Sequence, residues 1–176
     1  MTIEQKLTDK DIKKILVVDD REENTQAAKE YFQTIPIKTD YASSAQEAIT
    51  KMKENYKAET KYDLIITDLE METKNAGLDV VKEALNQTIY VTIATGMNYD
   101  QPEEHGHGPS TTIMPTKESI KGKKNNPEVW EQAMKITLDY IASPEIQRSY
   151  NSAKRYKKYT GKESELFKEI MLKLYK

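Results

Sequence analysis

The chain has 176 residues, the length of one ordinary domain with extensions, and 37% of them are hydrophobic, which suffices for a packed core. It contains no cysteine, which excludes a disulfide framework, a thiolate metal site and a cysteine nucleophile. The longest strictly apolar run, Ile15 to Val18, is too short for a transmembrane helix, and the first residues show no apolar stretch of signal-peptide length. We therefore expect a soluble cytoplasmic protein with no membrane partner.

Apolar periodicity alternates between strand and helix along the first half of the chain. Lys14 to Val18 is a β-branched run of the kind found in strands that are buried on both faces. Asp20 is positioned to cap the helix that follows it, and Ser43 or Ser44 to cap the next one. The pattern predicts strands at 14–18, 36–42, 64–67 and 89–94, and helices at 21–33, 44–55 and 78–85.

The second half begins with a stretch that has no apolar period. Residues 96–110 are rich in Gly, Pro and His and predict a long loop, so the strand at 89–94 lacks a following helix and one of its faces is expected to be poorly covered. A short fifth strand at 111–114 is expected to stop at Pro115. Asn126 and Pro127 mark the start of a further helix, and the predicted helices are 127–142, 144–159 and 166–174.

This order of elements predicts an α/β fold: a doubly wound, five-stranded parallel sheet with the fourth helix replaced by a loop and a helical extension at the C-terminus. We divide the chain into an N-terminal segment (1–11), the α/β domain (12–142) and a basic helical extension (143–176). The net charge is −8 over residues 1–116 and +6 over residues 117–176, so the two parts are expected to have different roles.

Acidic side chains stand where two of the predicted strands end. Asp19 and Asp20 follow the first strand, Asp68 follows the third, and the hydroxyl of Thr95 follows the fourth. Ligands of such sheets bind at the carboxyl ends of the strands, and converging carboxylates suit a hard cation such as Mg²⁺. With the ion in place, one carboxylate can act as a nucleophile towards phosphorus while a hydroxyl binds the phosphoryl oxygens.

Four motifs, in order and at family-like spacing, resemble the receiver domain of bacterial two-component response regulators over residues 12–142: Ile15–Asp20, Tyr62–Met71, Gly77-Leu78 and Thr92–Gly96. The resemblance implies a receiver/flavodoxin-like fold and a signalling protein that is not an enzyme. Asp68 would accept a phosphoryl group from a histidine kinase or phosphotransfer protein, and Thr95 would be the switch hydroxyl. Asp19 and Asp20 would hold Mg²⁺ together with Asp68 and the backbone carbonyl of Glu70.

The chain departs from the family pattern near the predicted fifth strand. The family has a Lys-Pro pair at the end of that strand, and its lysine grips the phosphoryl group; here the aligned pair is Met114-Pro115. Lys117 is the nearby candidate to replace the lysine. The family's aromatic switch residue is also missing from 111–113. A further departure lies in the loop after Asp68, where Glu72 stands in place of the family's usual proline.

Two further functions stay open on the sequence alone. A non-phosphorylated pseudo-receiver would keep the acidic pocket and act as a binding or scaffold module. A haloacid-dehalogenase-type phosphatase also uses an aspartyl-phosphate, and Asp68-Leu69-Glu70 followed by Thr92–Gly96 resembles its first two motifs; the order of the remaining carboxylates argues against it.

Two other patterns bear on metals and partners. His105 and His107 suggest a transition-metal site, but the pair has no obvious third ligand.

Residues 144–176 hold nine basic and four acidic residues with interleaved tyrosines, a composition compatible with binding to nucleic acid. A protein contact or a homodimer through the C-terminal helices is favoured over nucleic acid, because the apolar stripe of 166–174 is suited to docking.

Overall fold

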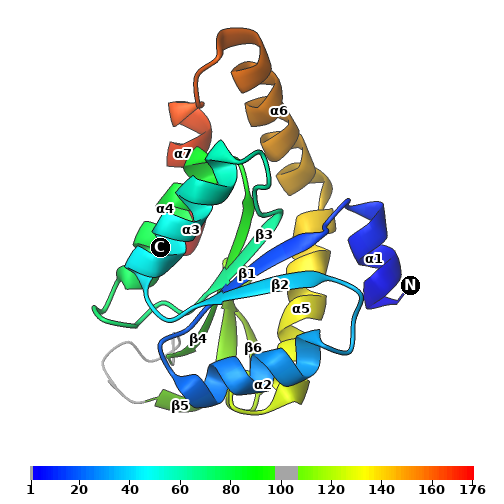
Figure 1. Cartoon of the computed structure of the whole chain (residues 1–176), viewed down its shortest axis with the longest axis vertical. Helices are drawn as coiled ribbons and strands as arrows, with labels where there is room; N and C mark the ends of the chain where they lie inside the picture. Colours follow the sequence, from blue (N-terminus) through cyan, green and yellow to red (C-terminus); the bar gives the residue numbers. More distant parts are fainter. Residues whose placement is uncertain (1, 98–106) are drawn as a thin grey trace.

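A mixed six-stranded sheet forms the centre of the computed structural model, which describes residues 2–97 and 107–176 (Figure 1). The strand order is β2-β1-β3-β4-β5-β6. The first four strands are parallel, whereas β5 runs antiparallel to both of its neighbours. The strands are β1 (Lys14–Val18), β2 (Lys38–Ala42), β3 (Leu64–Thr67), β4 (Tyr90–Met97), β5 (His107–Met114) and β6 (Glu118–Lys121).

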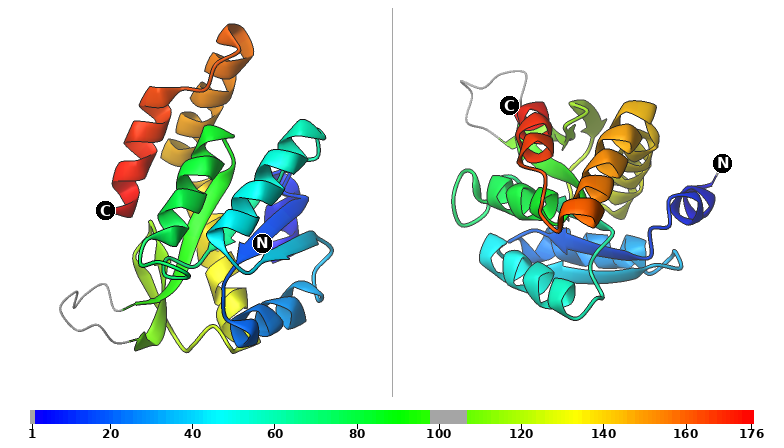
Figure 2. Two further views of the ribbon diagram at one scale, coloured as in Figure 1. Left: turned by 60° about the vertical axis from the view of Figure 1, so that its left-hand side comes forward. Right: turned by 90° about the horizontal axis from the view of Figure 1, so that it is seen from above.

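Helices cover both faces of the sheet. On one face α2 packs against α5 and α5 against α1; on the other α3 packs against α4 and α4 against α7 (Figure 2). The long helix α6 continues beyond the end of α5, and α7 then folds back beside α4. The helices are α1 (Ile3–Asp9), α2 (Glu22–Phe32), α3 (Ala45–Lys57), α4 (Ala76–Asn86), α5 (Pro127–Ala142), α6 (Pro144–Thr160) and α7 (Glu165–Leu172), followed by the 3-10 turn η1 (Lys173–Tyr175). Among the described residues, no helix combines the length and apolar content needed to cross a membrane.

The two central parallel strands confirm the prediction made from their apolar runs. Every residue from Ile15 to Val18 and from Leu64 to Ile66 is buried, since helices lie on both sides of them. Each such aliphatic side chain contributes roughly 1.5–3 kcal/mol by leaving water. The predicted caps are confirmed for α3, where Ser44 Oγ accepts from the Glu47 N–H at 3.1 Å, and for α5, where Asn126 accepts from the Glu128 N–H at 3.0 Å.

Two local predictions were wrong, and one helix lies in a segment for which no element was predicted. Asp20 does not cap α2, whose N-cap residue is Arg21 without a side-chain cap bond. The segment 1–11 contains the unpredicted helix α1, which Thr2 and Gln5 begin with a reciprocal capping box. The face of β4 expected to be poorly covered is also buried: Thr92 Oγ1 shares a hydrogen bond of 3.0 Å with Thr137 Oγ1 of α5.

The sheet differs from the predicted one beyond β4, because it has six strands rather than five parallel ones. β4 extends to Met97 and β5 begins at His107, so part of the predicted loop 96–110 is strand, and the two strands pair antiparallel with Thr95 opposite Thr112. A tight turn then leads into β6, which pairs antiparallel with β5 and therefore runs in the same direction as β1 to β4. The short strand β6 was missed because only Ile120 among its four residues is buried. Residues 98–106, which include His105 of the predicted histidine pair, lie outside the described residues.

The C-terminal elements complete the cover of β4. Tyr175 of η1 is buried and donates a hydrogen bond of 2.5 Å from its hydroxyl to the carbonyl of Val91. Tyr150 of α6 packs between Tyr90 of β4, at a centroid distance of 4.4 Å, and Phe167 of α7, which it meets edge to face at 5.0 Å. The core therefore runs without interruption from the sheet into the C-terminal helices.

Candidate functional site

The ends of two adjacent parallel strands bring three carboxylates together. Val18 of β1 pairs with Thr67 of β3, so Asp19 and Asp20 leave the sheet beside Asp68. The backbone continues the ladder at this point, since the Asp68 N–H donates to the Val18 carbonyl at 2.8 Å. One carboxylate oxygen from each of the three residues lies within 4.8 Å of the other two. The structure thus places these side chains together, as the strand-end position predicts.

A buried lysine that the sequence analysis missed joins two of these carboxylates. The ammonium of Lys124 lies 2.6 Å from Asp19 Oδ2 and 2.7 Å from Asp68 Oδ2, and only 5% of the lysine side chain is exposed. Lys124 belongs to the loop between β6 and α5, where Trp130 Nε1 donates to its carbonyl at 2.7 Å. The fully buried indole therefore fixes the loop that presents the ammonium.

Lys117 does not fill this position, which corrects the prediction that it replaces the family's lysine. Its side chain faces the C-terminal residue, with the ammonium 3.5 Å from the carbonyl of Lys176. The aligned pair Met114-Pro115 does not supply a cation either: Met114 pairs with Ile93, level with Thr67, and because β5 runs antiparallel the chain after Met114 leads away from the carboxylates. A signal for the correct residue was present: Lys123 and Lys124 lie three and two residues before Asn126, which with Pro127 marks the helix start.

Further contacts hold the Asp19 carboxylate in place. Its Oδ1 accepts from the backbone N–H of Arg21 at 3.0 Å and from the Asn24 amide at 3.0 Å. Asn24 is buried on the first turn of α2 and was not recognised in the sequence, since a polar residue on a helix gives no functional signal by itself. These donors and Lys124 together satisfy a carboxylate that is almost completely buried.

The electrostatic balance at Asp68 favours a bound cation. Burial raises the pKa of the Asp68 carboxyl and the neighbouring Asp19 charge raises it further, whereas Lys124 lowers it. Its Oδ1 also accepts the backbone N–H of Leu69 at 2.7 Å. With Asp20 the cluster holds three carboxylates, and an additional positive charge would relieve the repulsion between them.

The donor set fits Mg²⁺, which binds carboxylate and carbonyl oxygens at about 2.1 Å, so that opposite ligands lie about 4.2 Å apart. Asp20 is exposed, and one carboxylate oxygen from each of the three residues lies within 4.8 Å of the other two, which is close to that span. Glu70, whose carbonyl is the remaining predicted ligand, lies two residues beyond Asp68 in the loop that follows β3. The residues present are therefore compatible with the predicted ion.

Gly77, the first residue of the Gly77-Leu78 motif, is packed directly on the Asp68 backbone. A Cβ atom added there would lie 2.0 Å from the Asp68 carbonyl oxygen and 2.7 Å from the Leu69 Cα. The Gly77 N–H also donates to the Leu69 carbonyl at 2.9 Å. Only glycine lets the start of α4 approach so closely, and this approach fixes the backbone that carries Asp68.

A pocket of about 210 Å³ opens above these groups, lined among others by Arg21, Asp68, Gly96, Thr111 and Lys124. Thr95 is buried on β4, one strand from Asp68, because Thr67 pairs with Ile93 and Thr95 follows two residues later. It does not itself line the pocket, whereas its neighbour Gly96 does. The pocket is thus small, polar and walled by both acidic and basic side chains.

One family model matches the part of the chain that carries the three carboxylates. The family model described as the response regulator receiver domain matches residues 15–105. A solved structure described as a response regulator receiver domain protein from Clostridium thermocellum aligns with a TM-score of 0.49 and 23% identity, covering 73% of this chain and 96% of that one. A search of curated proteins gave no significant match. The family match ends before β5, so it does not include Lys124.

Proposed function

The chain belongs to the response regulator receiver family of two-component signalling, and we propose that it acts as a phosphoaspartate switch in which Asp68 accepts a phosphoryl group with the help of Mg²⁺. The donor would be a cytoplasmic histidine kinase or phosphotransfer protein. The observation that carries the proposal is the ammonium of Lys124, which lies between Asp19 and Asp68 at hydrogen-bond distance from both. It supplies the cationic group that a phosphoryl acceptor of this kind needs.

The proposed transfer uses groups that already face the pocket. A carboxylate oxygen of Asp68 attacks the phosphorus of a phosphohistidine, the P–N bond breaks, and the imidazole leaves with the electron pair. Lys124 lies 2.7 Å from the carboxylate and would follow the new phosphoryl oxygens, while Asn24 continues to hold Asp19. Mg²⁺ bound by Asp19, Asp20, Asp68 and the Glu70 carbonyl would neutralise negative charge on the phosphoryl group.

The switch would be passed on through β4. Thr95, the proposed switch hydroxyl, lies on β4 near Asp68, and Val91 of the same strand accepts the hydroxyl of Tyr175 at 2.5 Å. A shift of β4 at Thr95 would therefore reach η1 and α7, which cover the strand. We propose these C-terminal elements as the output region for an unidentified protein partner.

Intact-mass measurement after incubation with acetyl phosphate and Mg²⁺ tests the proposal. We expect one added phosphoryl group on the wild-type chain, none on Asp68→Asn, and at least a tenfold slower addition on Lys124→Met. Lys117→Met is the matched control and should react like the wild type, since Lys117 lies against Lys176 instead. An adduct that persists in Asp68→Asn would contradict the proposal.

The two competing functions predict different results. The absence of any adduct on the wild-type chain, at every Mg²⁺ concentration, would favour a non-phosphorylated binding module. Turnover of para-nitrophenyl phosphate that depends on Asp68 would favour a phosphatase. We expect neither, because the ammonium of Lys124 lies 2.7 Å from the Asp68 carboxylate and receiver domains are typically phosphoacceptors.

A further inference from the structure

The C-terminal helix α7 carries apolar side chains on two sides, and only one of these sides is buried against the rest of the chain. Phe167, Met171 and Tyr175 point inward and are at most 7% exposed. On the outer side Leu166 is 67% exposed, Ile170 49% and Leu174 39%. These three residues, which we call the α7 stripe, are spaced by four positions and so form one continuous row along α7 and η1.

The α7 stripe is not an isolated patch, because it borders a groove. A cavity of about 690 Å³ lies between α6 and α7, and its walls include Tyr156, Leu166, Phe167 and Ile170. Tyr156 adds a further exposed aromatic ring, 47% of which is accessible. Large exposed apolar surfaces of this kind mark contacts with another molecule in proteins that are otherwise well packed.

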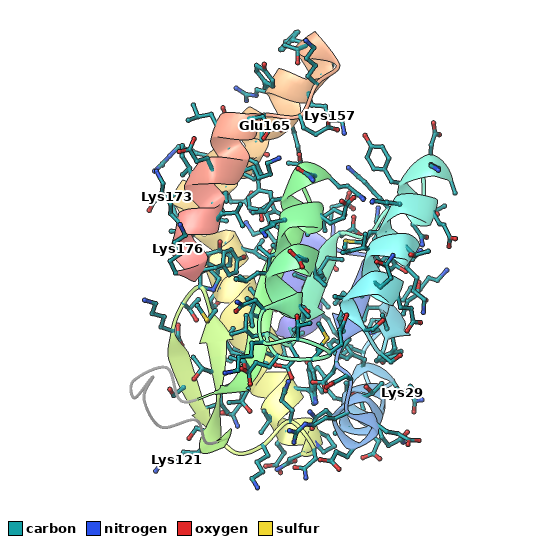
Figure 3. All side chains as sticks on the ribbon, turned by 90° about the vertical axis from the view of Figure 1, so that its left-hand side faces the viewer. Lys29, Lys121, Lys157, Glu165, Lys173 and Lys176 are labelled. Atoms are coloured by element: carbon teal, nitrogen blue, oxygen red, sulfur yellow. The ribbon has the colours of Figure 1, made fainter. Side chains whose placement is uncertain are left out.

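Charges beside the stripe indicate what that molecule is. Glu169 and Lys173 each precede a stripe residue by one position, so they lie on the same flank of the helix. Both side chains are about two thirds exposed and form a loose i,i+4 pair at 3.7 Å. Figure 3 shows Glu165 near the upper end of α7, Lys173 below it and Lys176 at the lower end. The outer side of the helix thus changes from acidic to basic along its length.

This arrangement is complementary to itself under a two-fold rotation about Ile170. If a second copy of α7 lies antiparallel, Ile170 meets Ile170 of the other copy and Leu166 meets Leu174, since both are four residues from the centre. The same rotation brings Glu169 of each copy next to Lys173 of the other, about two residues away along the helix axis. An isologous dimer interface requires this kind of self-complementarity.

We propose that the α7 stripe is the interface of a symmetric homodimer, in which the α7 helices of two copies pack antiparallel and cross at Ile170. The interface uses residues that take no part in the acidic pocket, so its test does not require that Asp68 is phosphorylated. An unrelated amphipathic segment would match the apolar row but would not be expected to match the order of the charges.

Sedimentation equilibrium of the full chain tests the proposal, and we expect a dimer with a dissociation constant on the order of 10 µM, as for a small interface. Ile170→Lys places two ammonium groups face to face at the two-fold axis and should weaken association at least roughly thirtyfold. Tyr159→Lys is the matched control: Tyr159 is 81% exposed on α6 but lies outside the stripe, and its replacement should leave the dimer unchanged.

A charge exchange tests the antiparallel order. Glu169→Lys and Lys173→Glu should each weaken the dimer roughly fivefold, and the double variant should restore it, because the exchange recreates both the pair across the interface and the pair within the helix. Circular dichroism checks that all variants keep their helices. The proposal is overturned if the wild type stays monomeric at roughly 200 µM, if Ile170→Lys dimerises normally, or if the double variant is weaker than either single one.

Discussion

The sheet has a parallel half, β1 to β4, and an antiparallel half, β5 and β6, and both bring side chains to the same edge through different kinds of connection. From β1 to β4 the strands are parallel, and each connection includes a helix that crosses a face of the sheet. β5 and β6 instead follow as antiparallel neighbours joined by a tight turn. Because two reversals restore the original direction, β6 ends at the same edge as β1 and β3 and brings Lys124 to Asp68. Strand direction, rather than strand number, decides which side chains meet.

The two halves contribute side chains of opposite charge to the acidic pocket. The parallel half supplies Asp19, Asp20 and Asp68, and the loop after β6 supplies Lys124. The ion pairs from Lys124 to Asp19 and Asp68 are buried. Without the lysine, the parallel half would bury two carboxylates that lack a partner, and without the carboxylates the ammonium would be buried unpaired. The acidic pocket is therefore an electrostatic contact between the halves as well as a candidate reaction site.

Removal of this contact should have the largest effect on stability. We expect Lys124→Met to lower the free energy of unfolding by about 4 kcal/mol without Mg²⁺, because it leaves two buried carboxylates unpaired. Added Mg²⁺ should recover part of the loss. Lys117→Met should change stability by less than about 0.5 kcal/mol, as for most surface substitutions. Urea denaturation measures all of these, and equal losses in the two variants would contradict the role of Lys124.

A smaller but still large loss is expected within the parallel half. Gly77→Ala forces a Cβ to 2.0 Å from the Asp68 carbonyl, so either α4 or the loop must move. We expect a cost of about 3 kcal/mol, typical of severe overpacking. Gly161→Ala is the control: its φ of 70° is unfavourable for alanine but no atom lies within 4 Å, so about 1 kcal/mol is expected. A Gly77 variant as stable as the Gly161 variant would show that the contact is easily relieved.

The smallest effect concerns the C-terminal cover of β4. Tyr175→Phe removes the hydrogen bond from the tyrosine hydroxyl to the Val91 carbonyl and should lower the unfolding free energy by about 1 kcal/mol at pH 7. Denaturation in urea measures the change. A neutral result would mean that η1 is held by apolar packing alone.

The pH dependence of stability provides the control for this variant. Burial raises the pKa of Tyr175 well above its usual value of about 10. The folded state therefore keeps a proton that the unfolded state loses, and the stability that is present below pH 10 falls as the pH rises above it. The decline should be shallower in Tyr175→Phe, since one of the contributing hydroxyl groups is gone.

The sequence was sufficient for the parallel half because its signals are local. The apolar runs at 15–18 and 64–66 predicted buried strands, and Asp19, Asp20 and Asp68 follow directly from where those runs end. Asn126 and Pro127 likewise marked the start of α5. Each of these features depends on residues close together in the chain, so periodicity and capping preferences were enough to find them.

Long-range features could not be found in this way. Lys124 pairs with Asp19 across 105 positions, and β6 has a single buried residue. The sequence by itself determined which strands are buried and which carboxylates stand at their ends, because burial and chain direction leave a periodic pattern. Only the tertiary structure decided that β5 reverses, that Lys124 rather than Lys117 reaches the carboxylates, and that Tyr175 closes the face of β4. These outcomes depend on how distant segments pack, which local patterns do not encode.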